Sequence, residues 1–159
     1  MYERPSIDDV FLKMASVIGE RGTCDRGRCG AVLVLNKRVL AAGYAGAPAG
    51  MPHCDDVGHD MATRTGADGK TTKHCVRTTH AEINSICNAA RNGVATDGAT
   101  LYCKFEPCFD CAKAIINAGV KRVVCERRYH AAAKSRELLI QAGVELMVVH
   151  DELEIYPEQ

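Results

Sequence analysis

Apolar side chains recur along the chain with two different periods, one typical of helices and one typical of strands. Between Ile7 and Ile18 they fall three or four positions apart, which predicts an amphipathic helix with Ser6 as a suitable N-cap. The next apolar run, CGAVLVLNKRVLAAGYAG, is divided by Asn36 and Lys37 and predicts two short strands joined by a tight turn. We therefore expect the chain to begin with one helix and one β-hairpin.

The second half of the chain alternates between helical and strand patterns. The predicted helices cover residues 80–92, 108–118 and 131–142, and the predicted strands cover residues 99–105, 121–126 and 144–149. Gly119 and Gly143 each separate a helix from the following strand, as glycines at helix C-termini do. This alternation favours crossover connections and a largely parallel sheet after an antiparallel first pair. We predict a single α/β domain over residues 1–159, with three α/β/α layers and a mixed sheet of about five strands.

Residues 45–79 follow neither pattern. The segment is rich in Gly, Pro, Asp and Thr and is too long for an ordinary connector. Together with a cysteine just before the first strand, it offers four soft ligands, which predicts a closed structural zinc site that pins this insertion loop. The assigned ligands are Cys24, Cys54, His59 and Cys75. His53 and His74 remain alternatives for the fourth ligand, and free cysteines beside ordinary surface histidines would give the same weak spacing.

Composition and charge exclude several classes of function. The 159 residues include 20 basic and 20 acidic side chains, with 47% apolar and 25% charged positions, as in ordinary soluble domains. A dedicated nucleic-acid-binding domain would carry a basic excess, so we expect a small-molecule partner and no nucleic acid. The N-terminal segment carries charges among its apolar positions, which argues against a signal peptide or membrane span and favours a cytoplasmic protein. Nine cysteines in such a protein indicate metal binding or catalysis rather than disulfides.

Two short motifs place metal ligands at the starts of predicted helices. The first is HAE at residues 80–82, and the second is EPCFDC at residues 106–111. Cys108 and Cys111 are three positions apart on one helical face, where the helix dipole favours thiolates. With His80 they form a set of three ligands that leaves one position for water, which is the arrangement of a catalytic zinc.

Glu82 is the candidate proton carrier of this site. It follows His80 by two positions and leaves the helix in another direction, so it is poorly placed as a ligand and well placed to reach water and substrate. It is expected to take a proton from the water that the zinc activates and to deliver it to a ring nitrogen and the departing amine. The pattern H-x-E followed by P-C-x-x-C is the known signature of zinc nucleobase deaminases.

The chain resembles the bacterial and phage deoxycytidylate (dCMP) deaminases over nearly its whole length. The stretches that carry the resemblance are CDRGRCGAVLVLNKRVLAAGYAGAPAG, HCDDVGHD, HCVRTTHAEINSI, GATLYCKFEPCFDCAKAIINAGVKRVV and RRYH. The resemblance implies a cytidine-deaminase-like fold, zinc-dependent hydrolysis of dCMP to dUMP and ammonia, activation by dCTP, inhibition by dTTP, and a homohexamer. The alternatives are a deaminase of modified dCMP, dCTP or tRNA adenosine, and a non-catalytic protein that senses nucleotides.

The resemblance also implies which residues contact the nucleotide, and two of them depart from the family pattern. The family usually has GYNG where this chain has GYAG, so Ala45 removes an amide, and Lys104 stands where relatives have a small hydroxyl. The residues expected at the nucleotide are Ala81, Arg28, Ala45, Lys104 and Tyr129. Arg91 matches a family position at the subunit and effector interface. Lys104, Tyr129, Arg28 and Arg91 could equally be ordinary surface or boundary residues.

Overall fold

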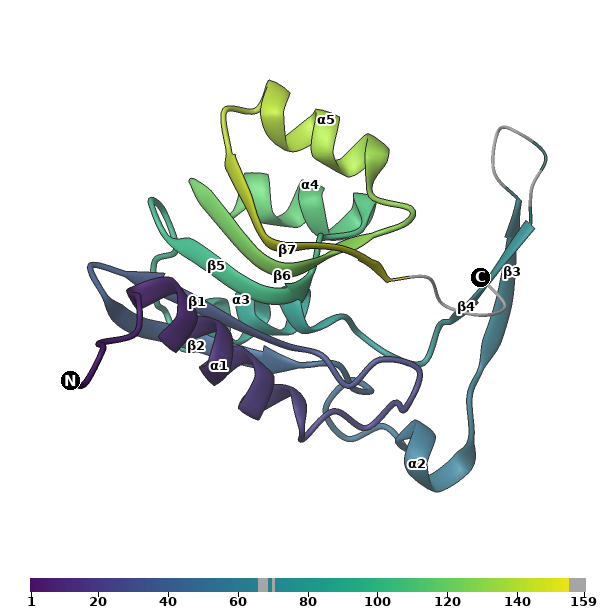
Figure 1. The fold of residues 1–159 in the computed structure, drawn as a ribbon. Helices are drawn as coiled ribbons and strands as arrows, with labels where there is room; N and C mark the ends of the chain where they lie inside the picture. Colours follow the sequence, from purple (N-terminus) through teal and green to yellow (C-terminus); the bar gives the residue numbers. More distant parts are fainter. Residues whose placement is uncertain (66–68, 70, 155–159) are drawn as a thin grey trace.

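The structure is a computed structural model that describes residues 1–65, 69 and 71–154. Helices and strands alternate along most of the chain (Figure 1). In chain order they are α1 (Ile7–Gly19), β1 (Gly30–Leu35), β2 (Arg38–Tyr44), α2 (Cys54–Val57), β3 (Met61–Thr65), β4 (Thr71–Cys75), α3 (Ala81–Arg91), β5 (Thr100–Phe105), α4 (Phe109–Asn117), β6 (Arg122–Tyr129), α5 (Ala133–Gln141) and β7 (Glu145–Glu154). Each helix and main-sheet strand expected from the sequence is present, with ends shifted by a few residues.

The main sheet is mixed, as the sequence predicts, and has five strands in the order β2-β1-β5-β6-β7. The pairs β5–β6 and β6–β7 are parallel, whereas β1 pairs antiparallel with both β2 and β5. The expectation of a largely parallel sheet was therefore too strong, because the direction in which β5 meets β1 depends on the path of the chain between them. No local pattern in either strand specifies that direction.

Helices cover both faces of this sheet and complete the three predicted layers (Figure 1). Along β1 the side chains alternate, so that Ala31 and Leu33 face the core beneath α3, α4 and α5, while Val32 and Val34 face α1. Leu33 and Val32 are both fully buried, and each such side chain contributes about 1.5–3 kcal/mol. Burial on both faces explains why β1 is an uninterrupted apolar run.

Local signals in the sequence account for the first helix and the first turn. The Ser6 hydroxyl accepts a hydrogen bond from the Asp9 backbone N–H at 3.1 Å, and the Asp9 carboxylate accepts one from the Ser6 N–H at 3.2 Å. This reciprocal capping box fixes the start of α1. In the β1–β2 turn, Asn36 and Lys37 have φ angles of 51° and 62°, so both adopt the left-handed conformation that two-residue hairpin turns require.

The insertion at residues 45–79 contains structure that the sequence did not predict. After the short helix α2, strands β3 and β4 pair antiparallel as a separate two-stranded sheet that projects from the main body (Figure 1). Residues 66–68 and 70 of this insertion, and residues 155–159 of the predicted domain, lie outside the described part of the chain. No helix within the described part is both long and apolar enough to cross a membrane.

Close packing of α3 against β2 fixes the helix that begins beside His80. A Cβ atom on Gly43 would lie 2.4 Å from the Ser85 backbone nitrogen and 2.7 Å from the Ala81 carbonyl oxygen. Only glycine allows this approach. Asn84 and Asn88 of α3 then donate side-chain hydrogen bonds to carbonyl groups of β2, at 2.7 and 2.8 Å. The sheet edge thus holds the start of α3 in place.

Candidate active site

Two helix starts converge to bring together the three predicted zinc ligands. His80 is the N-cap residue of α3 and Cys108 is the N-cap residue of α4, and neither side chain makes a capping hydrogen bond. The His80 Nδ1 atom lies 3.5 Å from the Cys108 sulfur and 3.4 Å from the Cys111 sulfur. All three potential ligand atoms lie within 4.8 Å of one another.

This geometry fits a zinc ion. Zinc binds sulfur and imidazole nitrogen at about 2.0–2.3 Å in a tetrahedron, so its ligand atoms lie about 3.5 Å apart. The two measured separations from His80 match that value. Three protein ligands would leave the fourth position of the tetrahedron open.

The three side chains also hold protons that a bound zinc ion would displace. Hydrogen bonds from Cys111 and His80 lower the pKa of Cys108 to about 4, so this sulfur is a thiolate at neutral pH. The hydrogen bond to Cys108 raises the pKa of His80 to about 9. The hydrogen bond with Cys108 and burial raise the pKa of Cys111, so this thiol keeps its proton until a metal ion displaces the proton. A thiolate beside a second sulfur and an imidazole is a donor set that zinc prefers.

Glu82 lies beside these ligands and faces the same space. It is the one acidic residue in the first turn of α3, and burial raises the pKa of its carboxyl group. A carboxyl group with a raised pKa in a cleft is suited to accept and return a proton.

A cavity of about 140 Å³ opens over this group and is lined by His80, Glu82 and Cys108. Its other walls come from the loop before β1 and the first residue of that strand, from the ends of β5 and β6, from β4 with the residues after it, and from the residue after β2. Four of the five residues expected at the nucleotide line this cavity, namely Ala45, Ala81, Lys104 and Tyr129. Lys104 also lies over the Phe105 ring, with its ammonium nitrogen 5.0 Å from the ring centre.

Arg28 and Arg91 lie elsewhere. The Arg28 guanidinium donates two hydrogen bonds to Asp55 at 3.1 and 3.2 Å and also contacts the Gly22 carbonyl, so it links the loop before β1 to α2. It does not line the cavity that the described residues form. Arg91 is the exposed last residue of α3, at the opposite end of the helix from His80.

Four polar residues of the cavity were not predicted as substrate contacts. They are Arg26, His74, Thr78 and Glu106. Arg26 stands in the same DRGRC stretch as Arg28, and the sequence does not show which arginine turns inward. Glu106 belongs to the EPCFDC motif, where its proximity to the ligands was the available signal.

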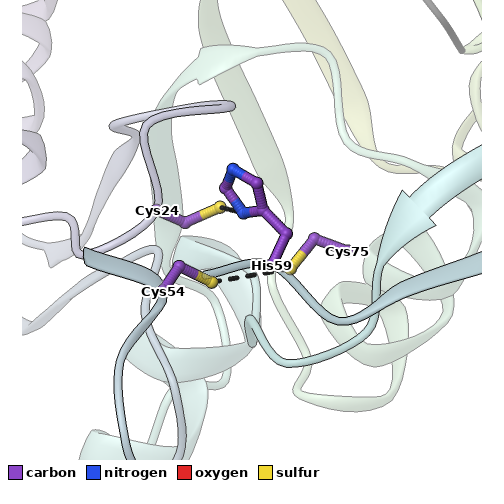
Figure 2. A group of neighbouring side chains, drawn as sticks. All are labelled: Cys24, Cys54, His59 and Cys75. Atoms are coloured by element: carbon purple, nitrogen blue, oxygen red, sulfur yellow. Dashed lines mark hydrogen bonds between the residues drawn. The ribbon is translucent and has the colours of Figure 1, made fainter. Parts of the chain in front are cut away.

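A second group of ligands is formed by Cys24, Cys54, His59 and Cys75, whose ligand atoms also lie within 4.8 Å of one another. Figure 2 shows these side chains pointing toward a common point from separate segments. The sulfurs of Cys54 and Cys75 are 3.5 Å apart, and the Cys24 sulfur lies 3.7 Å from the His59 Nδ1 atom. Four donors close a tetrahedral zinc site, unlike the three beside Glu82.

The two alternative histidines are engaged elsewhere. His53 pairs with the Thr23 hydroxyl at 2.9 Å, and His74 pairs with the Thr72 hydroxyl at 2.8 Å. His59, in contrast, has its second ring nitrogen 3.0 Å from the Asp25 carboxylate, the kind of outer partner that orients a metal-bound histidine. None of the nine cysteines, all of which lie in the described part of the chain, forms a disulfide, as both ligand groups require.

Comparison with known proteins points to one family. Residues 5–127 match the family described as "Cytidine and deoxycytidylate deaminase zinc-binding region". ComE operon protein 2 of Bacillus subtilis is 40% identical over 142 residues, which cover 89% of this chain and 70% of that protein. The deoxycytidylate deaminase of Schizosaccharomyces pombe is 38% identical over 143 residues, and the match spans 90% of this chain but 44% of the yeast protein.

A solved structure agrees with these sequence relatives. The dCMP deaminase of cyanophage S-TIM5, crystallised with dCMP and dUMP, superimposes with a TM-score of 0.71 at 30% identity. The match covers 96% of this chain and 100% of the phage chain.

Proposed function

The chain belongs to the cytidine and deoxycytidylate deaminase family, and we propose on this basis that it hydrolyses dCMP to dUMP and ammonia. The observation that carries the proposal is the group of His80, Cys108 and Cys111 at the wall of a cavity that Glu82 also lines. The relatives named as deoxycytidylate deaminases and the phage enzyme bound to dCMP and dUMP support this choice of substrate.

The residues of the site have separate roles in this reaction. A zinc ion held by His80, Cys108 and Cys111 would lower the pKa of water and so supply a nucleophile at neutral pH. Glu82 accepts one proton from the attacking water and passes it to the ring nitrogen, and it then takes the second proton of that water, from the new hydroxyl group on the ring carbon, and passes it to the departing amino group, which leaves as ammonia. Because Glu82 is not part of the ligand group, it stays free to carry this proton.

Charge and shape in the cavity fit a nucleotide monophosphate. Arg26 and Lys104 both line the cavity and offer cations for the phosphate, while Tyr129 and Ala81 offer surfaces for the base and sugar. Ala45 also lines the cavity, at the position where the family pattern GYNG has an asparagine amide. Arg28 is engaged with Asp55, so we assign it to holding the loop before β1 and not to the phosphate.

The second ligand group would bind a structural zinc ion. Its four ligands come from separate segments. Cys24 lies in the loop before β1, Cys54 begins α2, His59 lies two residues after the end of α2, and Cys75 ends β4. A metal bound by all four would join the insertion to the main body of the protein, and few apolar side chains are buried among the described residues of the insertion.

The assembly and its control form the remaining part of the proposal. Four apolar residues of α1 stay exposed at helical spacing, namely Ile7, Val10, Met14 and Val17. Such a stripe suits contact with other copies of the chain in a homohexamer. Activation by dCTP and inhibition by dTTP would act through further subunit contacts, and Arg91, exposed at the end of α3 on the other face of the sheet from α1, is the residue that the family resemblance assigns to them. The assembly is tested by comparing the mass of the wild-type particle in solution with the mass of the Val17→Glu particle.

The substrate is tested by following ammonia release from the purified protein with dCMP, dCTP, 5-methyl-dCMP, CMP and deoxycytidine, each with and without dCTP or dTTP as effector. Preferential turnover of dCMP supports the proposal and makes Ala45 and Lys104 tolerated variation. Preference for another compound would show that these two residues have changed the specificity of the pocket. Nucleotide binding without turnover of any compound would favour the alternative of a non-catalytic protein that senses nucleotides.

A further inference from the structure

Glu106 is a buried carboxylate that none of the roles above uses. Its side chain is only 1% exposed. An unpaired carboxylate at such a position costs several kcal/mol, so its partners indicate what it is for. Glu106 lies between the end of β5 and the N-terminus of α4, two residues before the ligand Cys108.

Its partners come from two elements that follow β5 in the chain. The Arg136 guanidinium of α5 donates hydrogen bonds to the two Glu106 oxygens at 2.9 and 3.0 Å. The backbone N–H of Tyr129, at the end of β6, donates to Glu106 Oε2 at 3.1 Å. Arg128 adds a longer ion pair of 3.9 Å. A single carboxylate thus joins β5, β6 and α5 at the edge of the cavity.

The contact with Tyr129 continues the sheet beyond the end of its backbone pairing. The parallel pairing of β5 with β6 ends at Phe105 and Arg127. Tyr129 comes two residues after Arg127, where β5 has already ended and the chain leads through Pro107 into α4. The Tyr129 N–H therefore donates to the Glu106 side chain in place of a backbone carbonyl group of β5. On the side of β5 the Tyr129 backbone is therefore held by a side chain, whereas β7 pairs with it on the other side, and Tyr129 lines the cavity.

We propose that Glu106, fixed by Arg136, is a positioning residue that holds Tyr129 against the nucleotide. The inference rests on the proposed function, in which Tyr129 contacts the substrate. A pair kept for stability alone could be replaced by apolar side chains, because a buried ion pair stabilises a fold no more than they do. Glu106 also accepts a directional hydrogen bond from the backbone N–H of Tyr129, which apolar side chains could not replace.

The matched control is a similar pair on the other face of the sheet. Asp8 of α1 accepts hydrogen bonds from Arg122 of β6 at 2.8 and 2.9 Å. Neither residue lines the catalytic cavity. Glu106→Gln and Asp8→Asn make the same change from acid to amide in two-pronged arginine pairs, so they separate positioning from stability.

The experiment measures the melting temperature, zinc content, KM and kcat of both variants with dCMP. We expect both to lose stability and keep their zinc, while Glu106→Gln alone raises KM by about tenfold and changes kcat by less than about threefold, since a misplaced contact weakens substrate and transition state alike. In a Tyr129→Ala background, Glu106→Gln should raise KM by less than about threefold more, because both substitutions remove the same contact.

Arg136→Lys keeps the cation without the two-pronged geometry, and it provides the test if Glu106→Gln does not fold. It should raise KM in the same direction by a smaller factor. An unchanged KM in Glu106→Gln and Arg136→Lys, or full multiplication of the Glu106→Gln and Tyr129→Ala effects, would overturn the inference.

Crystal structures of the wild type and of Glu106→Gln or Arg136→Lys separate this inference from the proposed function. If the wild-type protein turns over no nucleotide, the proposed function fails, and the structures still report on Tyr129. Displacement of Tyr129 from the cavity wall in the variant supports the positioning role. An unmoved Tyr129 overturns it.

Discussion

His80 and Glu82 show how two residues in one helical turn take different roles. The N-cap position of His80 turns its ring toward the sulfurs of α4, whereas Glu82 leaves α3 from its first turn and lines the cavity. The separation follows from the 3.6-residue period of the helix, in which positions two apart do not share a face.

Replacing Glu82 by glutamine is the most specific test at this scale. Glu82→Gln removes proton transfer and keeps the size of the side chain, so we expect kcat to fall by at least about 10²–10⁴-fold with the fold and zinc content unchanged. Turnover, circular dichroism and metal analysis check this. Glu137→Gln, the same change at an exposed position of α5, serves as control, and normal turnover in Glu82→Gln would contradict the proposed role.

The ligand residues could be predicted because their spacing encodes a local geometry. Cys108 and Cys111 lie on one face of any helix that begins there, and the HAE motif gives the third ligand. Arg28 could not be placed from the sequence, because its pairing with Asp55 joins positions 27 apart in the chain. The same limit applies to Arg26, whose inward direction depends on the path of the loop.

At the scale of elements, the site depends on how tightly α3 lies against β2. Gly43→Ala would place a Cβ atom within 2.4 Å of the α3 backbone, so the helix must shift. We expect a loss of about 1–3 kcal/mol in the free energy of unfolding and a lower kcat/KM, because His80 and Glu82 move with the helix. Chemical denaturation and kinetics measure both.

Val39→Ala, at an exposed position of the same strand, is the control for this change. It should leave kcat/KM unchanged. If Gly43→Ala lowers stability and keeps full activity, the position of α3 is not what sets the geometry of the site.

The insertion is expected to depend on its own group of metal ligands. Cys54→Ser should remove one equivalent of zinc and lower the melting temperature by roughly 5–10 °C, while leaving the chemistry of the catalytic site largely intact. Cys108→Ser should instead lose the catalytic zinc and activity together. Cys87→Ser changes an exposed cysteine outside both groups and should alter neither property.

Metal analysis and thermal melting of the three variants decide the matter. Full zinc occupancy in Cys54→Ser would show that Cys24, Cys54, His59 and Cys75 do not hold a zinc ion.

The elements themselves were predictable to different degrees for a physical reason. The main strands and helices bury apolar faces, and this burial imposes the period that the sequence displays. Every residue of strands β3 and β4 is exposed or half-buried and neither strand buries an apolar face, so the hairpin left no pattern to detect. Only its ligands, His59 just before it and Cys75 at its end, indicated that the insertion was ordered.

At the scale of the whole molecule, one ion pair joins the first helix to the sheet. Asp8 accepts hydrogen bonds from Arg122 at 2.8 and 2.9 Å and from the Tyr102 hydroxyl at 2.8 Å. The hydrogen bond from Arg122 holds the pKa of Asp8 below its usual value despite burial, which acts in the opposite direction. The first helix and the middle of the sheet, far apart in sequence, are thus linked by a charge that depends on pH.

This link predicts how stability varies with pH. Because the pKa of Asp8 is lowered in the folded state, its contribution is complete above the unfolded value of about 3.9 and is lost as the pH falls through the folded value. The free energy of unfolding of the wild type should exceed that of Asp8→Asn by about 1 kcal/mol at pH 7, and this difference should shrink below about pH 4. Urea unfolding at several pH values measures it, and a constant difference would argue against the ion pair.

The order of the sheet is also a property of the whole molecule, and the sequence did not specify it. Each strand could be located from its own residues, but the antiparallel contact of β1 with β5 joins segments separated by the entire insertion. Pairing at that distance depends on the path of the chain, for which the local periods carry no information.

In the proposed function, a zinc ion held by His80, Cys108 and Cys111 would act with the carboxylate of Glu82 to deaminate dCMP. The most direct test measures dUMP and ammonia formed from dCMP, with zinc determined in the same protein sample. We expect equal amounts of both products, loss of turnover when a chelator removes the zinc, and recovery when zinc returns. Protein with its zinc sites filled that forms no dUMP from dCMP would contradict it.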